Sequence, residues 1–364
     1  MAMIADLGLY KTVIMAEKEH LTISLDFHGV QVLVMVDDEV CGSLVAADFS
    51  YFRKDLVRNP SLSIAVSLTE PPYDRIPTTA RLRRVTKDAK VYEADGIRYL
   101  DSFGKALVIW AFTSESIEIY SADRELLREK AYLMIMSRVG YFLDRRGLHR
   151  IHAMGVVFKG RAVVCAMAMG GGKTTLTLGL MEHHGFSLLS DEVPLVSRNG
   201  QLSGMPIRLG VREDAELAIP AEFVSRFVRT RYPPKLLIDA GYFGERVETS
   251  AEPGIFFVGR REGLSRPGVR PVGSLAAFRV LFEMCVLARG VPELLEYVLR
   301  TQPRALARQA LIFLSRLRAC YALLRGSRCY LLDLSGDPEA NARFVAAFVA
   351  RELEDEHEGR VNAA

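Results

Sequence analysis

The sequence predicts an α/β fold of the α+β kind, with a mostly β N-terminal region over residues 1–122 and an α/β core over residues 123–364. Two observations lead to this prediction. Short runs of apolar residues at β-strand spacing, separated by turn-forming residues, extend from residue 21 to about residue 120. Farther along, an apolar strand pattern leads through three consecutive glycines directly into a helical pattern, within residues 161–185.

The N-terminal region holds clear strand patterns, and local sequence indicates the turns between them. The tract EPPYDRIPTT at 70–79 is rich in proline and predicts a surface loop. Asp95-Gly96 lies between two apolar runs and predicts the turn of a hairpin. The strand patterns are LTISLDF at 21–27, VQVLVMV at 30–36, LSIAVSL at 62–68 and SIEIY at 116–120.

The core begins with a predicted amphipathic helix at 123–146, which has Asp123 near its start and Gly147 just past its end. The following tract, 148–166, predicts two strands that turn at Lys159-Gly160. The remaining patterns are a helix at 173–184 that stops at Gly185, a strand with acidic residues at 186–197, a strand at 253–259, helices within 276–324, a strand at 329–334 and a helix at 341–356.

Composition excludes several classes of protein. A formal net charge of +3 over 364 residues gives no support for nucleic-acid binding. The five cysteines are scattered, without C-x-x-C spacing, which argues against a zinc site and indicates buried thiols in a reducing compartment. The N-terminus lacks the uninterrupted apolar stretch of a signal peptide, and no apolar run is long enough to span a membrane. We therefore expect a cytoplasmic protein without a membrane partner.

The tract AMAMGGGKTT at 166–175 matches the end of the phosphate-binding pattern G-x-x-x-x-G-K-[ST], or Walker A motif, with Met167 in place of its first glycine. Backbone N–H groups at a helix N-terminus, a lysine and a hydroxyl are what a nucleoside triphosphate requires. The alternative is a flexible loop in which Lys173 is a solvated helix start. The candidate ATP-binding residues are Ala168, Met169, Gly170, Gly171, Gly172, Lys173, Thr174 and Thr175.

An acidic pair, Asp191-Glu192, follows eighteen positions after Lys173, at the end of an apolar run. Phosphoryl transfer requires carboxylates that hold Mg²⁺ and, for a hydroxyl nucleophile, a base. A strand of a parallel-type sheet would bring at least one acid close to the nucleotide. The alternative is that Asp191 caps a turn and that Glu192 points to solvent.

Taken together, residues 151–196, IHAMGVVFKGRAVVCAMAMGGGKTTLTLGLMEHHGFSLLSDEVPLV, resemble the HPr kinase/phosphorylase superfamily, and most closely the HPr kinase-related proteins of bacterial gene clusters. The shared features are a histidine-bearing strand, a β-hairpin, a G-x-G-K-[ST] loop, a helix that ends in glycine and an L-L-S-D-[DE] strand. The resemblance is strongest over residues 148–210. It implies the nucleotide-binding core that this superfamily shares with phosphoenolpyruvate carboxykinases.

The resemblance also implies roles for individual residues. Lys173 would hold the β and γ phosphates, and Thr174 would ligate magnesium. Asp191 would be a metal partner or the catalytic base, Glu192 occupies the second acidic position, and His152 falls where the superfamily has a histidine near the metal and phosphates. Catalytic candidates are therefore Asp191, Glu192, Lys173 and His152, and the metal candidates are Thr174 and Asp191.

Two further residues and two departures qualify this assignment. Arg208 and Lys235 are candidate phosphate or substrate contacts, although exposed basic residues are more often simply solvated. Met167 replaces the first loop glycine, a change expected to alter nucleotide affinity. The signature that follows the acidic pair in HPr kinases proper has no convincing match, which puts HPr itself in doubt as the substrate.

The favoured hypothesis is a Mg²⁺- and ATP-dependent kinase that phosphorylates a hydroxyl of a peptide, a small protein or a metabolite. A second hypothesis is a nucleotide-binding sensor or accessory protein of a biosynthetic cluster, without turnover. ATP hydrolysis coupled to motion ranks last, because no transporter element is recognisable. The oligomeric state stays open, with a homo-oligomer as one alternative because superfamily members often assemble.

The C-terminal third also contains an arginine-rich segment, residues 300–328, and no acidic residue lies between Glu296 and Asp333. One interpretation is a dock for an acidic protein or peptide. The alternative is the polar face of an amphipathic helix whose arginines meet acids elsewhere, with the acidic run at 352–358 as one partner.

Overall fold

The computed structural model describes residues 20–229, 232–290 and 303–361, and it is a mixed α/β protein with several sheets. The N-terminal tract and the helical pattern at 291–302 lie outside the described residues. Contacts between residues divide the chain into two units. The first extends to Tyr132, apart from Asp48–Tyr51, which belong with Leu133 onward to the second. This division falls inside a long helix, whereas the sequence predicts a boundary before it.

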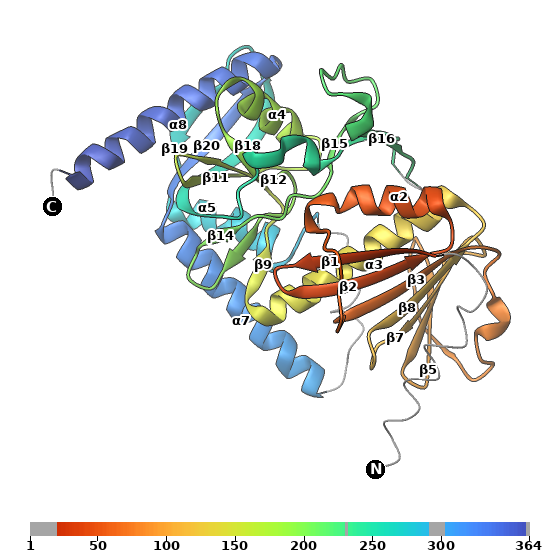
Figure 1. Cartoon of the computed structure of the whole chain (residues 1–364). Coiled ribbons are helices and arrows are strands. Elements are labelled where there is room, and N and C mark those ends of the chain that lie inside the picture. The colour runs from red at the N-terminus through yellow and green to blue at the C-terminus, as the bar shows by residue number, and fades with distance from the viewer. Residues whose placement is uncertain (1–19, 230–231, 291–302, 362–364) are drawn as a thin grey trace. The chain divides into compact units, whose positions relative to one another are not determined.

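Among its described residues, the first unit contains a curled, half-barrel sheet of eight strands in the order β1-β2-β3-β8-β7-β6-β5-β4 (Figure 1). The four predicted strand patterns are confirmed as β1, β2, β3 and β8. Asp95 and Gly96 have φ values of 48° and 79°, so this predicted turn is also confirmed. The strands are β1 Leu21–Phe27, β2 Val30–Val36, β3 Leu62–Leu68, β4 Arg81–Val85, β5 Lys90–Ala94, β6 Ile97–Asp101, β7 Leu107–Ala111 and β8 Ser116–Ser121.

The long helix α3, Arg124–Arg146, confirms the prediction at 123–146. Oδ1 of Asp123 accepts hydrogen bonds from the backbone N–H groups of Glu125 and Leu126, at 2.9 and 3.2 Å, and so caps the helix N-terminus. Gly147 has a φ of 79°, which lets the chain leave the helix in the left-handed conformation. Helix α2, Glu39–Asp48, also belongs to the first unit, except for its last residue, Asp48, which belongs to the second.

The central sheet of the second unit brings four strand ends to one edge. Strand β10 is antiparallel to both β11 and β12, while β18 and β20 continue the sheet parallel to β11. Strands β11, β12, β18 and β20 therefore run in the same direction, and their carboxyl ends lie at the same edge. The bounds are β10 Met154–Phe158, β11 Arg161–Ala166, β12 Ser187–Ser190, β18 Ser250–Leu264, β19 Gly268–Pro271 and β20 Arg328–Ser335.

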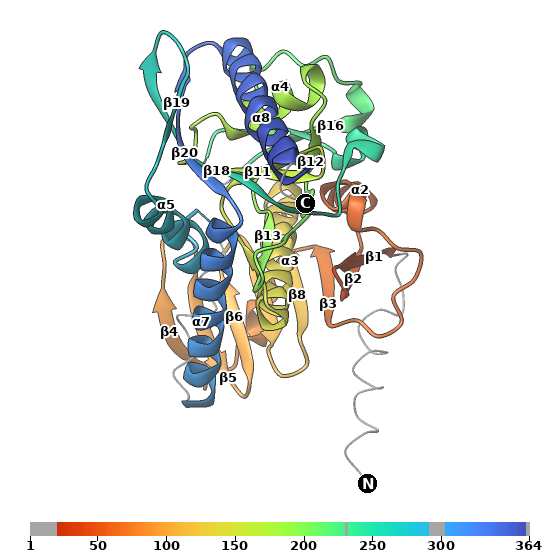
Figure 2. The same cartoon turned by 90° about the vertical axis from the view of Figure 1, so that its left-hand side faces the viewer.

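Helices cover both faces of this sheet, because alternate strand residues point to opposite sides. Val163 and Phe257 belong to a core formed with α4 and α8, which pack side by side (Figures 1 and 2). Val164 and Phe256 belong to a second core formed with α5 and α7. The helices are α4 Lys173–His183, α5 Ser274–Leu281 with its π-helical continuation η5 Phe282–Val286, α7 Pro303–Arg325 and α8 Pro338–Val361.

Two predicted strand tracts differ from the structure. The tract 148–166 forms three strands, because β9, Leu148–Arg150, precedes the hairpin of β10 and β11. The tract 186–197 is not one strand: the acidic pair lies in a connection between β12 and β13, Leu195–Ser197. Ser190 Oγ accepts the N–H of Val193 at 3.1 Å, and Pro194 has no N–H to give to a ladder, so the strand is interrupted there.

Smaller sheets complete the second unit. Strands β9, β13 and β14 join the early part of β18, and β15, β17 and β16 form a separate three-stranded sheet among the described residues. Their bounds are β14 Leu202–Ser203, β15 Leu209–Arg212, β16 Val224–Phe227 and β17 Lys235–Ile238. In the described part of the chain, no helix combines the length and the apolar character needed to cross a bilayer.

Candidate nucleotide-binding site

The glycine loop connects the end of β11 at Ala166 to the start of α4 at Lys173. Gly170 and Gly172 have φ values of 76° and 103°, in the left-handed region that glycine adopts most readily. The N–H of Gly171 donates to the carbonyl of Ala168 at 3.1 Å, which tightens the turn. The loop therefore delivers the chain to a helix N-terminus, where unpaired backbone N–H groups favour an anion.

Lys173 is buried beneath this loop rather than solvated, so the alternative of a solvated helix start is wrong. Its Nζ donates to the carbonyl oxygens of Met167 at 2.8 Å and Ala168 at 3.3 Å, and lies 3.3 Å from Nε2 of His152. Burial lowers the pKa of Lys173, although the nearby carboxylates of Asp191 and Glu192 act in the opposite direction.

Asp191 is also buried, and two hydroxyl groups of α4 hold it. Thr174 donates to one carboxylate oxygen at 2.6 Å, and Thr177 donates to the other at 3.0 Å. Burial raises the pKa of Asp191, the charge of Glu192 raises it further, and the two hydroxyl contacts partly offset this effect. The carboxylate predicted to lie near the nucleotide thus packs against the first turn of α4.

Glu192 is exposed, as the alternative interpretation expected, and its charge nevertheless reaches the site. It raises the pKa of His152, Lys173 and Lys235, although burial makes the net shift of each pKa downward. Glu192 therefore lies on the solvent side of the acidic pair, and Asp191 lies on the buried side.

His152 faces Lys173 from the connection between β9 and β10. Its backbone N–H donates to the carbonyl of Met284 at 3.2 Å, and Nδ1 makes no hydrogen bond to any residue in the described ranges. A Cβ at Gly290 would lie 2.6 Å from the imidazole, so only glycine fits beside the ring. Burial lowers the pKa of His152, and the charge of Lys173 lowers it further.

Lys235 and Arg208 come from the three-stranded sheet and the tract before it, and neither is simply solvated. Half-buried Lys235 has its pKa lowered by burial and by Arg229, while the acidic pair raises it, so its ammonium lies within the field of Asp191 and Glu192. Arg208 is buried and pairs with Asp48 at 2.5 Å, and its guanidinium carbon lies 4.1 Å from the ring centre of Phe227.

Met167 is buried in the core rather than directed into the loop. A Cβ added at Gly171 would lie 2.5 Å from its Cγ and Sδ atoms, and one added at Gly259 would overlap its Cε atom. The side chain therefore fills space left by these two glycines. This packing could not be predicted from local sequence, because Gly259 lies on β18, far along the chain.

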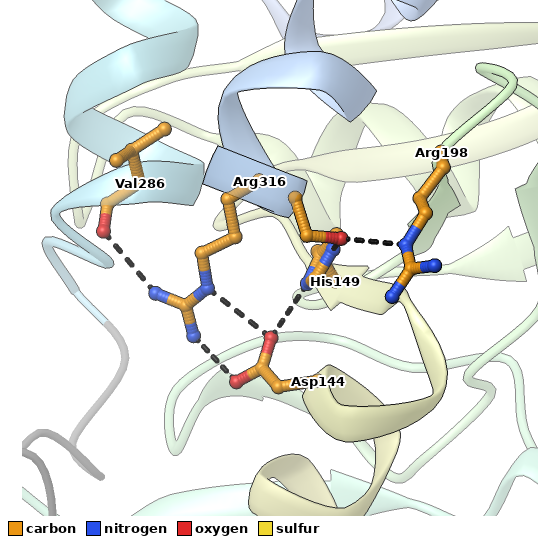
Figure 3. A network of polar contacts seen from close by, with 6 residues as sticks. Asp144, His149, Arg198, Val286 and Arg316 are labelled. Atoms are coloured by element: carbon orange, nitrogen blue, oxygen red, sulfur yellow. Dashed lines mark hydrogen bonds and ion pairs between the residues drawn. The ribbon is translucent and has the colours of Figure 1, made fainter. Parts of the chain in front are cut away.

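A second buried polar network, which no sequence pattern indicates, lies in the same unit (Figure 3). The carboxylate of Asp144 accepts hydrogen bonds from Nε of Arg316 at 3.1 Å and from Nη2 at 2.6 Å, and lies 2.7 Å from Nδ1 of His149. Burial alone would raise the pKa of Asp144, but Arg316 and His149 together hold it well below its usual range. Nη1 of Arg316 also donates to the carbonyl of Val286 at 3.2 Å.

Asp144, His149 and Ser315 have the residue types of a nucleophilic triad, with Ser315 Oγ 2.8 Å from His149 Nε2. Three features assign the network to structure instead. His149 is fully buried, the charge of Asp144 is neutralised by Arg316, and Ser315 lies within α7, where backbone N–H groups are bonded inside the helix. Through Val286 the network holds η5, whose Met284 receives the N–H of His152.

The arginine-rich segment confirms part of the interpretation that its charges meet acids elsewhere. Arg316 pairs with Asp144, and Arg328 pairs with Glu352 of the acidic run at 3.0 Å. Arg300 lies outside the described residues. As predicted, the cysteines are free thiols, and all except half-buried Cys329 are buried.

The side chains around the glycine loop offer a metal ion hydroxyl and carboxylate oxygens, from Thr174, Thr177 and Asp191. In the described part of the chain, no group of three or more histidine, cysteine or acidic residues could hold a metal ion. A search against models of protein families and a search of curated proteins find no match for the chain. The resemblance over residues 148–210 therefore stays a prediction that rests on the residues themselves.

Proposed function

We propose that the protein is a Mg²⁺-dependent kinase that transfers the γ-phosphoryl group of ATP to a hydroxyl, on a serine or threonine of a peptide or small protein or on a small metabolite. One observation carries the proposal. The first turn of α4 holds both Lys173, under a loop with left-handed glycines, and the carboxylate of Asp191. This combination agrees with the resemblance to HPr kinase-related proteins.

The loop would bind the phosphates through its backbone and through Lys173. Buried Lys173 now contacts two loop carbonyl oxygens, and its lowered pKa records the cost of keeping a charge there. A phosphate beside the ammonium would stabilise the charged form and raise this pKa again. Pairing with phosphate therefore offsets a penalty that the free protein carries.

The side chains of Thr174 and Asp191 fit a magnesium ion. Their oxygen atoms lie 2.6 Å apart, and Mg²⁺ takes oxygen ligands, using only one or two carboxylates together with phosphates and water. When bound, magnesium would neutralise charge on the phosphates. Thr177 would keep the second oxygen of Asp191 in place through its 3.0 Å hydrogen bond.

Asp191 and Glu192 would have different roles in the transfer. Both oxygens of Asp191 accept hydroxyl hydrogen bonds, whereas Glu192 is exposed beside it. We therefore assign metal orientation to Asp191 and removal of the acceptor's proton to Glu192. Lys235, which lies in the field of both acids, would contact a phosphate or the acceptor. His152, whose Nε2 lies 3.3 Å from Nζ of Lys173, would orient the ammonium as a neutral imidazole.

The test is transfer of radiolabelled phosphate from ATP into candidate acceptors, beginning with proteins and peptides encoded beside this gene. Lys173→Ala and Asp191→Asn should each lower the rate by about 100-fold or more. Lys159→Ala is the matched control, because this lysine occupies an exposed turn and pairs with Glu354. Retained transfer in either site variant, with folding intact, would contradict the mechanism.

The sensor hypothesis makes a different prediction. It rested on the departure at Met167, and the burial of that side chain in the core removes a reason to expect a damaged loop. Calorimetry with ATP and a non-hydrolysable analogue, paired with the transfer assay, separates the two hypotheses. Tight binding without transfer to any acceptor would favour the sensor.

A further inference from the structure

Helix α7 has apolar side chains on two opposite faces. One face packs into the core beside α5 through residues that include Ala319, Cys320 and Leu323. On another face, Leu311 and Leu314 are 68% and 59% exposed, and Tyr321 is 59% exposed. An amphipathic helix at a protein surface normally presents polar residues to water, so this second apolar face requires an explanation.

The exposed residues repeat at coiled-coil spacing. Successive members are separated alternately by four and three positions, an average period of 3.5, and such a period forms a narrow seam for knobs-into-holes packing with another helix. We call this set the α7 stripe. Its members, all exposed, are Ala307, Leu311, Leu314, Arg318, Tyr321 and Arg325.

The stripe is positively charged and has no acid of its own. The sequence contains no aspartate or glutamate between Glu296 and Asp333. Arg318 and Arg325 occupy positions within the stripe, and the guanidinium carbon of Arg325 lies 5.9 Å from the ring centre of Tyr321. The basic residues thus lie in line with the apolar ones, rather than along the rims of the stripe.

We propose that the α7 stripe binds an acidic amphipathic helix of a partner protein. Leucines on the partner would pack against Leu311, Leu314 and Tyr321, and its carboxylates would pair with Arg318 and Arg325. The side-chain area offered is that of one helix face, which suits a transient complex. This partner is distinct from ATP and from the phosphoryl acceptor.

Charge decides between this occupant and two others. A second copy of the stripe would bring arginines against arginines, with no acid to separate them. A membrane would require the arginines in the middle of the stripe to enter the apolar layer, whereas membrane-surface helices keep their basic residues on the polar face. An acidic helix satisfies both the apolar and the basic members.

The experiment uses the full chain and two labelled helical peptides of about three heptads, which share leucines at the seam. One peptide carries glutamates beside the seam and the other carries lysines. In fluorescence anisotropy, the glutamate peptide should bind at least tenfold more tightly than the lysine peptide. The double variant Arg318→Glu and Arg325→Glu should reverse this preference.

Two variants at exposed leucines distinguish binding at the α7 stripe from non-specific hydrophobic binding. Leu314→Ser should weaken binding of the glutamate peptide at least tenfold, whereas Leu275→Ser, which changes an 83% exposed leucine on α5, should leave it unchanged. Because both positions are exposed, both variants should keep the wild-type circular dichroism spectrum. Equal binding of the two peptides, or no binding of either, overturns the proposal.

The other occupants give different results in the same set of measurements. A wild-type dimer in analytical ultracentrifugation that Leu314→Ser converts to a monomer would assign the stripe to a second copy. Binding to vesicles of anionic lipid that Leu314→Ser abolishes, without peptide binding, would assign it to a membrane. Either result would contradict the partner proposed here.

Discussion

The glycine-loop site and the Asp144 network both bury charged groups in the second unit, and their surroundings act on those charges in opposite ways. Around the loop, the pKa of Lys173 is lowered and that of Asp191 is raised, mainly by burial, so both shift toward the neutral form. In the network, Arg316 and His149 lower the pKa of Asp144 against the effect of burial, which favours its charged form.

The difference lies in the partners. Asp144 is held by the bidentate guanidinium of Arg316. Among the described residues, Asp191 instead receives hydroxyls, and Lys173 contacts carbonyl oxygens and an imidazole. Removing one partner of a buried ion pair destabilises a protein strongly, while buried ionisable groups with shifted pKa values are candidates for a functional site. The comparison therefore agrees with a structural role for the network and with the ligand site proposed for the loop.

The largest expected effect is in the network. Asp144→Asn should lower the free energy of unfolding by about 3–5 kcal/mol, because it removes the carboxylate charge that pairs with the buried guanidinium of Arg316. Urea denaturation followed by circular dichroism measures this change. A loss below about 1 kcal/mol would show that the network is not a structural centre.

The next largest loss of stability is expected when the buried side chain of Met167, at the start of the glycine loop, is shortened. Met167→Ala should cost about 3 kcal/mol, since it empties a buried space beside Gly171 and Gly259. Met169→Ala is the matched control, because Met169 lies in the same loop and is 65% exposed. Its free energy of unfolding should stay within about 0.5 kcal/mol of wild type. Equal effects of the two changes would refute the packing described for Met167.

Substitution of Asp191, beside the glycine loop, should change the free energy of unfolding by a smaller amount and in the opposite direction. Asp191→Asn should raise the free energy of unfolding by about 1 kcal/mol at neutral pH while it lowers the proposed phosphoryl transfer by about 100-fold or more, a trade-off typical of functional sites. The raised pKa of Asp191 means that wild type loses stability relative to the variant as pH rises from about 4 through the folded-state value. Denaturation across this pH range should show the difference grow.

Asp144 should show the reverse dependence on pH. Since its pKa is lowered in the folded state, its contribution is present above the unfolded value and is lost as pH falls below about 4. The stability difference between wild type and Asp144→Asn should therefore shrink in acid. Parallel pH profiles for the Asp144 and Asp191 variants would show that the two carboxylates do not lie in opposite electrostatic environments.

The smallest effect belongs to a solvent-exposed pair in the same unit. Arg212 and Asp214 lie 2.6 Å apart, and both side chains are largely exposed. Asp214→Asn should change the free energy of unfolding by about 0.5 kcal/mol or less, because water and salt screen such pairs. A loss comparable to that of Asp144→Asn would mean that burial is not what distinguishes the network.

Features encoded in neighbouring residues could be predicted from the sequence. The hairpin turns at Asp95-Gly96 and Lys159-Gly160 depend on positive φ at two adjacent positions, and both form as predicted. The helix at 123–146 was marked by its cap and its final glycine. The glycine loop at 166–175 could be predicted because the phosphate-binding pattern consists of consecutive residues.

Features that depend on contacts across the chain could not be predicted. Arg316 meets Asp144 only because α7 packs against the end of α3, and nothing near either residue indicates the other. The sheet that holds the acidic pair is mixed rather than simply parallel, since β12 is antiparallel to its neighbour β10. The position of Lys235 near Asp191 likewise depends on the fold of the separate three-stranded sheet to which Lys235 belongs.

The packing of Met167 against Gly171 and Gly259 also constrains how this loop can evolve. While the Met167 side chain occupies this space, a Cβ at either glycine would force it to shift, and at position 259 a Cβ would also lie 2.7 Å from Sγ of Cys165. A glycine at position 167 would leave part of this space empty. The three positions should therefore vary together in relatives of this chain. The ordinary loop glycine at position 167 should cost least when the residues that line the vacated space change with it, which is a case of epistasis.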